Sequence, residues 1–293
     1  PEVIGLILGA YVLSMIRGEH QSKGGSSPII RFILGFFVMI GALMFLGCPI
    51  RMILRLGGGD LNALFGIAGF AGGIGFGTIF LKKGYSLQRT YALSKLESAM
   101  MPAIQVGLLV LVVTAPAFIF FSQKGPGAMH APWLISLAAG LVVGGLSQFS
   151  RLCTVGGFRD LFLFKKSILI FGYLAVLIGV FVVNISFGNF HLGFENQPIA
   201  HTDGLWNFLG MALAGFCSVL LGGCPLRQLI MTGEGNSDSA VTVLGLAAGA
   251  AFAHNFGLAA SGAGPTLNGE IAVGVGFVVA FIIAVLNTKR SNA

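Results

Sequence analysis

Long apolar stretches constrain the fold of this chain more than any other feature of its sequence. Most of them last about 20 residues, which suits an α-helix crossing a bilayer and is twice the length of a membrane β-strand. Only 9% of the 293 residues are charged, against roughly 25% in a soluble domain. The sequence therefore predicts an all-α polytopic membrane protein with about nine membrane helices, at 2–16, 29–47, 61–80, 99–121, 133–149, 167–185, 205–223, 238–260 and 267–287.

The basic residues predict the orientation of these segments. If the loop at 17–28 is cytoplasmic and each segment crosses once, 14 of the 17 Lys and Arg residues face inward. Only Arg51, Arg55 and Lys124 then face outward. This distribution follows the positive-inside bias, so the net charge of +7 needs no nucleic acid as a partner. It also places the C-terminus in the cytoplasm.

A short phrase around a cysteine occurs twice. Residues 46–51 read LGCPIR and residues 222–227 read GGCPLR, so Cys48 and Cys224 lie 176 positions apart in matching surroundings. Two such phrases with the same flanks indicate a duplicated unit. The same offset aligns four pairs of glycines: Gly57 with Gly233, Gly59 with Gly235, Gly69 with Gly245, and Gly73 with Gly249.

The number of segments between the two phrases predicts that the repeat is inverted. Five segments separate Cys48 from Cys224, so the two cysteines would enter the membrane from opposite faces. Inverted halves of transporters meet at a substrate site near the bilayer midplane. We expect a single integral membrane domain over 1–293, with halves at about 1–121 and 133–293. The stretches 49–60 and 225–237 would be re-entrant loops, because irregular backbone within a membrane lines a cavity or is buried in protein.

A third cysteine lies in a basic, glycine-containing turn. Residues 150–160 read SRLCTVGGFRD, and Cys153 would enter from the inner face. The repeat partner of this turn would fall upstream of Pro1, so we expect the natural protein to have a preceding segment with another cysteine.

These motifs together resemble the YeeE/YedE family of sulfur-compound transporters. The phrases GCPLRQ at 223–228 and AHNFG at 253–257 are most similar to its YedE branch, described as selenium transporters. The resemblance implies an hourglass-like protein of the bacterial inner membrane, in which thiols pass on an anion such as thiosulfate. The matching thiols are those of Cys48, Cys153 and Cys224. The resemblance also implies a cytoplasmic sulfur or selenium carrier protein as a possible partner.

Each of these residues also has a structural explanation. Buried cysteines are often small apolar packing residues, and this explanation is favoured for Cys217, whose repeat counterpart is Gly41. Arginines near membrane depth either capture an anion or pair with acids such as Asp60, Asp160 and Glu234. His254 and Asn255 either line the path or bridge helices. His191 and His201 are expected to be solvated loop residues without metal-ligand spacing, and GxxxG spacings such as Gly5 to Gly9 predict close helix contacts.

The function we predict is uptake of a small sulfur- or selenium-containing anion through a path lined by protonated thiols. Weak, repeated contacts let such an ion enter without being trapped. No cofactor, metal or ATP-binding motif is expected. The alternatives are a membrane thiol enzyme that performs sulfur or selenium transfer or redox chemistry, and a passive anion channel. The candidate path residues are Cys48, Cys153, Cys224, Pro49, Pro225, Arg51, Arg227, Arg151, Gly47, Gly223, His254 and Asn255.

Overall fold

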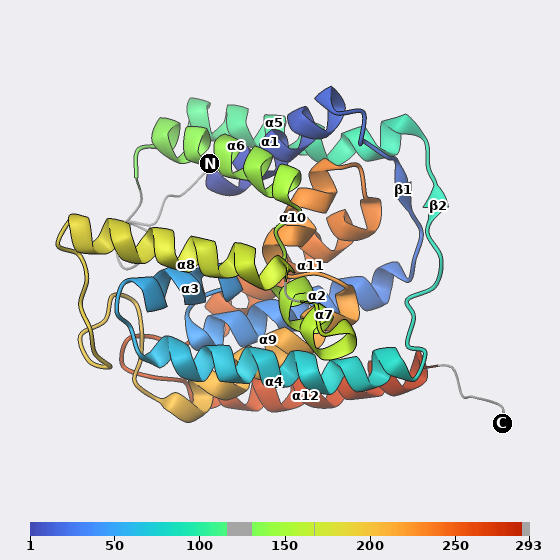
Figure 1. The fold of residues 1–293 in the computed structure, drawn as a ribbon. Helices are drawn as coiled ribbons and strands as arrows, with labels where there is room; N and C mark the ends of the chain where they lie inside the picture. Colours follow the sequence, from blue (N-terminus) through green and yellow to red (C-terminus); the bar gives the residue numbers. More distant parts are fainter. Residues whose placement is uncertain (116–130, 167, 289–293) are drawn as a thin grey trace. The chain divides into compact units, whose positions relative to one another are not determined.

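The computed structural model describes residues 1–115, 131–166 and 168–288, and these residues form two compact units (Figure 1). Unit 1 comprises Pro1–Ser26, Arg89–Arg151 and Arg227–Val241, and unit 2 comprises Ser27–Gln88, Leu152–Leu226 and Thr242–Ala293. Residues 116–121 of the expected fourth segment, Lys124, and the terminal Lys289 and Arg290 lie outside the described residues.

Unit 1 is built on three long helices and a short ribbon. Its elements are α1 (Glu2–Ile16), β1 (Lys23–Gly24), β2 (Tyr91–Ala92), α5 (Lys95–Thr114), α6 (Trp133–Ser150), most of α10 (Pro225–Gly233) and the first turn of α11 (Ser237–Asn255). The strands are antiparallel, with Lys23 opposite Ala92. Helix α1 packs against α5 and more extensively against α6 (Figure 1).

Unit 2 surrounds one buried helix. Its elements are α2 (Pro28–Phe45), α3 (Pro49–Gly57), α4 (Asn62–Lys82), α7 (Thr154–Phe164), α8 (Ile168–Ser186), α9 (Gly204–Leu221), the rest of α11, and α12 (Leu267–Leu286). Helix α9 contacts α2, α4, α7 and α12, and every residue from Gly210 to Leu221 is buried. Asp203 caps this helix by accepting a hydrogen bond from the Trp206 N–H at 3.1 Å, as expected at a helix start.

Most of the predicted segments coincide with helices, so the predicted all-α membrane class is confirmed. Seven helical stretches among the described residues are long and apolar enough to cross a membrane. Three of them join a long helix to a short one: Pro28–Gly57, Trp133–Phe164 and Gly204–Gly233. Helix α1 is apolar but has only 15 residues, about 22 Å at 1.5 Å per residue, which is less than the hydrocarbon core.

The GxxxG glycines lie at direct contacts between helix backbones, as their spacing predicts. A Cβ on Gly5 would lie 2.7 Å from the carbonyl oxygen of Leu137 in α6, so any larger residue would push α1 and α6 apart. In unit 2, a Cβ on Gly69 or Gly73 of α4 would collide with the backbone of Phe208 or Ala212 in α9. Small residues of this kind let membrane helices approach closely.

The contacts of unit 2 repeat at the offset found in the sequence. Gly69 and Gly73 face Phe208 and Ala212, and their counterparts Gly245 and Gly249 face Phe32 and Phe36. All four pairings are related by 176 positions, since Phe32 corresponds to Phe208 and Phe36 to Ala212. The helix pair α4 and α9 therefore has the same glycine-to-carbonyl contacts as the pair α11 and α2.

The turns after the two short helices are also equivalent. Gly59 and Gly235, 176 positions apart, have φ values of +100° and +96°, which favour glycine because it lacks a Cβ. Each turn pairs with a strand-like segment: the Gly193 N–H donates to the Gly59 carbonyl at 3.0 Å, and the Lys23 N–H donates to the Gly235 carbonyl at 3.3 Å. The preceding helices match as well, because Gly57 packs on Val180 of α8 while Gly233 packs on Ala10 of α1.

Candidate functional site

Each motif cysteine lies immediately before a short helix. Cys48 precedes α3, Cys153 precedes α7 and Cys224 precedes α10. Pro49 and Pro225 occupy the first helical positions, where proline fits because that N–H has no partner within the helix. The irregular backbone expected at 49–60 and 225–237 is therefore helical over most of each stretch, whereas the re-entrant course of these stretches stays a prediction. Their glycines come only at the end, so nine residues complete two helical turns before the chain reverses.

Two of the three thiols belong to one buried apolar cluster of unit 2, and the third lies next to a residue that this cluster contacts. Cys224 and Cys153 are 1% and 7% exposed and share a buried cluster with Tyr173, whereas Cys48 is half-buried. The Cys224 thiol interacts electrostatically with both Cys153 and Cys48. The Tyr173 hydroxyl donates to the Pro49 carbonyl oxygen at 3.3 Å. The fold thus brings together three cysteines that are far apart in the sequence.

The first turn of α7 donates one peptide N–H to a thiol. Cys153 is the N-cap residue, and its Sγ accepts a hydrogen bond from the Gly156 N–H at 3.3 Å. A Cβ on Gly156 would lie 3.5 Å from that sulfur. Helix N-termini carry partial positive charge, so this turn offers a favourable field to an anion beside the thiol.

Cys217 has a different environment. It is fully buried in α9 and is not a member of the cluster that contains Cys153 and Cys224. Its surroundings agree with the packing role that its unmatched repeat position favoured.

Arg51 is an arginine without a carboxylate partner among the described residues. Its side chain is half-buried and folds over Gly47, where a Cβ would lie 2.9 Å from the Arg51 Cδ. Asp60, one of the acids considered as a partner, pairs instead with Arg55 at 2.6 Å from Nε to Oδ2. Arg55 also donates to the Phe45 carbonyl oxygen at 2.6 Å and lies over the Phe45 ring.

The arginines of unit 1 are neutralised by glutamates. Arg227, the repeat counterpart of Arg51, lies 2.8 Å from Glu234, measured from Nη1 to Oε1. Arg151 lies 3.5 Å from the same carboxylate and 2.8 Å from Glu19. Both arginines therefore follow the pairing explanation, whereas Arg51 does not.

Glu19 was missed by sequence reasoning. It accepts hydrogen bonds from Arg17 at 3.1 Å, Gln148 at 3.1 Å and Arg151 at 2.8 Å. The hydrogen bond from Arg17, helped by the charge of Arg151, lowers the pKa of the Glu19 carboxyl. The available signal was that Glu19 is the single acid in the basic loop at 17–28.

The other residues predicted to line the path are two glycines before the cysteines and a His–Asn pair in α11. Gly223 is buried and Gly47 half-buried before their cysteines, and His254 and Asn255 have exposed side chains at the end of α11. The prediction that His201 is solvated was wrong, since it is 2% exposed and its Nε2 lies 2.8 Å from the Met44 carbonyl oxygen. The described residues contain no group of three or more His, Cys, Asp or Glu arranged to hold a metal ion.

Comparison with known proteins gives one family. Residues 149–288 match the model of a protein family described as sulphur transport. The matched stretch contains Cys153, Cys217 and Cys224 and ends with α12. No curated protein matches the chain.

Proposed function

Through residues 149–288 the chain belongs to the YeeE/YedE sulfur transport family, and we propose that it takes up a small sulfur-containing anion of the thiosulfate type. The family is one of transporters and not of enzymes, and the chain is a multi-pass helical membrane protein that carries a sulfur compound. We further propose that the substrate is thiosulfate-like and that the protein lies in the bacterial inner membrane with its C-terminus in the cytoplasm. A cytoplasmic carrier protein is proposed to receive the sulfur.

The observation that carries the proposal is the convergence of three thiols at the starts of three short helices. A neutral thiol is a weak hydrogen-bond donor and a polarizable contact for a soft sulfur or selenium atom. An apolar surrounding keeps a thiol neutral, and a neutral thiol does not repel an anion. Several weak sites in succession favour passage over tight binding. We place the path along Cys48, Cys224 and Cys153, with Pro49, Pro225, Gly47 and Gly223 shaping the turns beside them.

The difference between Arg51 and Arg227 suggests distinct tasks for the two arginines. Arg51 has no acidic partner among the described residues, so its charge is available to capture an incoming anion beside Cys48. Arg227 and Arg151 are held by Glu234, so an anion that reaches them has to compete with a carboxylate. Competition with the carboxylate favours release of the anion from these arginines. His254 and Asn255 are proposed to line the path more weakly.

The test is uptake into proteoliposomes of thiosulfate that carries ³⁵S at either the sulfane or the sulfonate sulfur. A transporter delivers both labels in equal amounts, whereas a thiol enzyme that transfers one sulfur separates them. Sulfate and selenite serve as competing anions, and saturation distinguishes a transporter from a passive channel. Uptake of selenite in preference to thiosulfate would reassign the substrate to selenium.

The cysteine variants test the path itself. Cys48→Ala, Cys153→Ala and Cys224→Ala are each expected to reduce uptake at least tenfold. Cys217→Ala is the matched control, because Cys217 is as buried as Cys224 but lies outside the cluster that contains Cys153 and Cys224. Equal losses in all four variants, or uptake that survives all of them, would show that the cysteines are packing residues.

The arginine variants test the capture step. Arg51→Gln is expected to raise KM for thiosulfate with little change in kcat, because it removes an attraction felt on entry. Arg227→Gln is expected to change KM less, since Glu234 already cancels that charge. A larger KM effect at Arg227 than at Arg51 would contradict the proposed division of tasks.

A further inference from the structure

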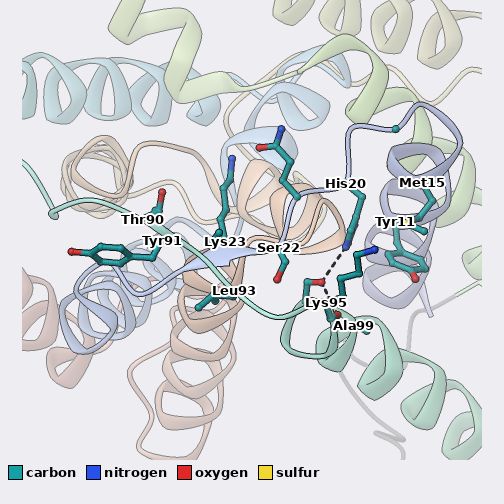
Figure 2. A pocket seen from close by; sticks show the side chains of 14 residues that line it. Tyr11, Met15, His20, Ser22, Lys23, Thr90, Tyr91, Leu93, Lys95 and Ala99 are labelled. Carbon is teal, nitrogen blue, oxygen red and sulfur yellow. Dashed lines mark hydrogen bonds between the residues drawn. The ribbon is translucent and has the colours of Figure 1, made fainter.

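A second site is suggested by a pocket in unit 1 that the transport path does not use. The pocket has a volume of about 870 Å³ and lies where the end of α1, the β1–β2 ribbon and the first turn of α5 meet (Figure 2). Three stretches of the chain line it, within 11–23, 90–93 and 95–99. The side chains that matter here are Tyr11, Met15, His20, Lys23, Tyr91 and Lys95.

The lining of this pocket is basic. It includes Lys23, Lys95 and His20 but no aspartate or glutamate, and neither lysine has an ion-pair partner among the described residues. The acids that neighbour it in sequence are engaged elsewhere, because Glu19 holds Arg151 at 2.8 Å and the Glu97 carboxylate lies 3.4 Å from the Ser94 hydroxyl. The pocket therefore favours an anionic ligand.

His20 adds a polar group that the fold leaves incomplete. Its Nε2 lies 3.2 Å from the Ser98 hydroxyl, and its ring packs edge-on against Tyr11 at 5.4 Å between centroids. Its Nδ1 is buried and has no hydrogen-bond partner among the described residues. Buried polar atoms normally have a partner, so this nitrogen is a group that the described part of the fold leaves unsatisfied.

The pocket adjoins exposed apolar side chains on two apolar helices, α1 and α5. On α1, Met15 and Ile16 are 53% and 76% exposed; on α5, Leu96 and Met100 are 77% and 56% exposed. Helix α5 is long and apolar enough to cross a membrane, and Lys95 is its first residue. The basic pocket thus lies at the level where a membrane helix begins, and apolar surface continues from it.

We propose that this pocket binds the phosphate headgroup of an anionic phospholipid. Lys23 and Lys95 attract the phosphate, and the acyl chains lie along Met15, Ile16 and Met100. Basic pockets beside membrane helices recognise anionic headgroups in this way, and an exposed aromatic ring such as that of Tyr91 is common at the membrane surface. The inference does not depend on the identity of the transported anion.

Lipid binding to the purified protein tests the proposal. Native mass spectrometry in detergent would measure the affinity for phosphatidylglycerol, phosphatidylcholine and glycerol 3-phosphate. We expect phosphatidylglycerol to bind at least tenfold more tightly than the other two. Lys23→Gln combined with Lys95→Gln should weaken its binding by roughly ten- to thirtyfold, given the contribution of a basic residue near an anionic headgroup.

Lys82→Gln combined with Lys83→Gln is the matched control. It removes the same charge from another exposed basic pair, at the end of α4, that does not line the pocket. An equal loss of affinity in the control pair would overturn the site, as would equal binding of phosphatidylcholine. Binding of glycerol 3-phosphate as tight as that of the lipid would assign the pocket to a soluble phosphate ester instead. Because the readout is binding and not uptake, failure here leaves the proposed transport function untouched.

Discussion

Replacing Asp60 with asparagine tests how much the buried ion pair between Asp60 and Arg55 of α3 contributes to stability. The Arg55 and Asp60 side chains are 5% and 3% exposed, and their closest atoms are 2.6 Å apart. Asp60 also accepts hydrogen bonds from the backbone and side-chain nitrogens of Asn62, both at 2.9 Å. The substitution leaves the Arg55 charge buried without its counter-ion. Removing one partner of such a pair costs about 3–5 kcal/mol.

The loss can be measured as thermal unfolding in detergent, followed by size-exclusion chromatography. At roughly 2–4 °C per kcal/mol for a chain of this size class, the midpoint should fall on the order of 10 °C. Asp160→Asn is the control, since Arg159 and Asp160 are also close, at 2.8 Å, but their side chains are 30% and 25% exposed. An exposed pair contributes at most about 1 kcal/mol.

A double substitution separates charge burial from general disruption. Arg55→Met combined with Asp60→Leu removes both charges and keeps an apolar core, so it should recover most of the lost stability. Equal midpoint shifts in Asp60→Asn and Asp160→Asn would refute the argument that burial of the pair sets its worth. So would a double variant that is less stable than Asp60→Asn.

Three further predictions concern packing and pH. Gly69→Ala and Gly245→Ala should each lower the free energy of unfolding by about 1–3 kcal/mol through overpacking. Gly274 has open space around it, so Gly274→Ala should raise the free energy of unfolding by about 0.5–1 kcal/mol. Unfolding midpoints would show whether the two repeat positions respond alike. The pKa of Glu19 is lowered in the fold, so the ionised carboxylate stabilises the protein above the unfolded-state pKa. This stabilisation is lost as pH falls through the folded-state pKa. The difference in unfolding midpoint between wild type and Glu19→Gln should therefore vanish in acid. Burial lowers the pKa of His201, so wild type should lose stability as pH falls below about 6.5, and His201→Gln should flatten that slope.

The long helices were predictable from the sequence because their apolar runs match the thickness of a bilayer. The short helices were not, because the glycines at 57–59 and at 233 and 235 suggested irregular backbone over the whole stretch. The nine residues after each cysteine contain a proline at the one helical position that tolerates it. The proline therefore indicates the start of a helix, and the glycines indicate only its end.

The repeat was visible in part. The offset of 176 aligned the cysteines and glycines because α2, α3 and α4 match α9, α10 and α11 without insertions. The match of α1 with α8 was hidden, since Val180 corresponds to Ala10 at an offset of 170. A loop that differs in length shifts the register without changing the packing.

Part of the candidate site required the fold. Tyr173 belongs to the cluster that contains Cys153 and Cys224. In the sequence it is one residue of a long apolar run, and only the fold shows that its hydroxyl donates to the Pro49 carbonyl. The freedom of Arg51 could not be predicted either. Both Arg51 and Arg55 were possible partners of Asp60, and in the fold Asp60 pairs with Arg55 beside the turn at Gly59.

The glycine contacts between α4 and α9 also restrict how such a protein can move. Where Gly69 and Gly73 meet the carbonyls of Phe208 and Ala212, no layer of side chains separates the two backbones. Sliding one helix along the other would drive a Cβ or a carbonyl into the opposing chain at every step, so this interface offers no shear plane. We therefore expect α4 and α9 to move as one rigid body in any rearrangement of unit 2.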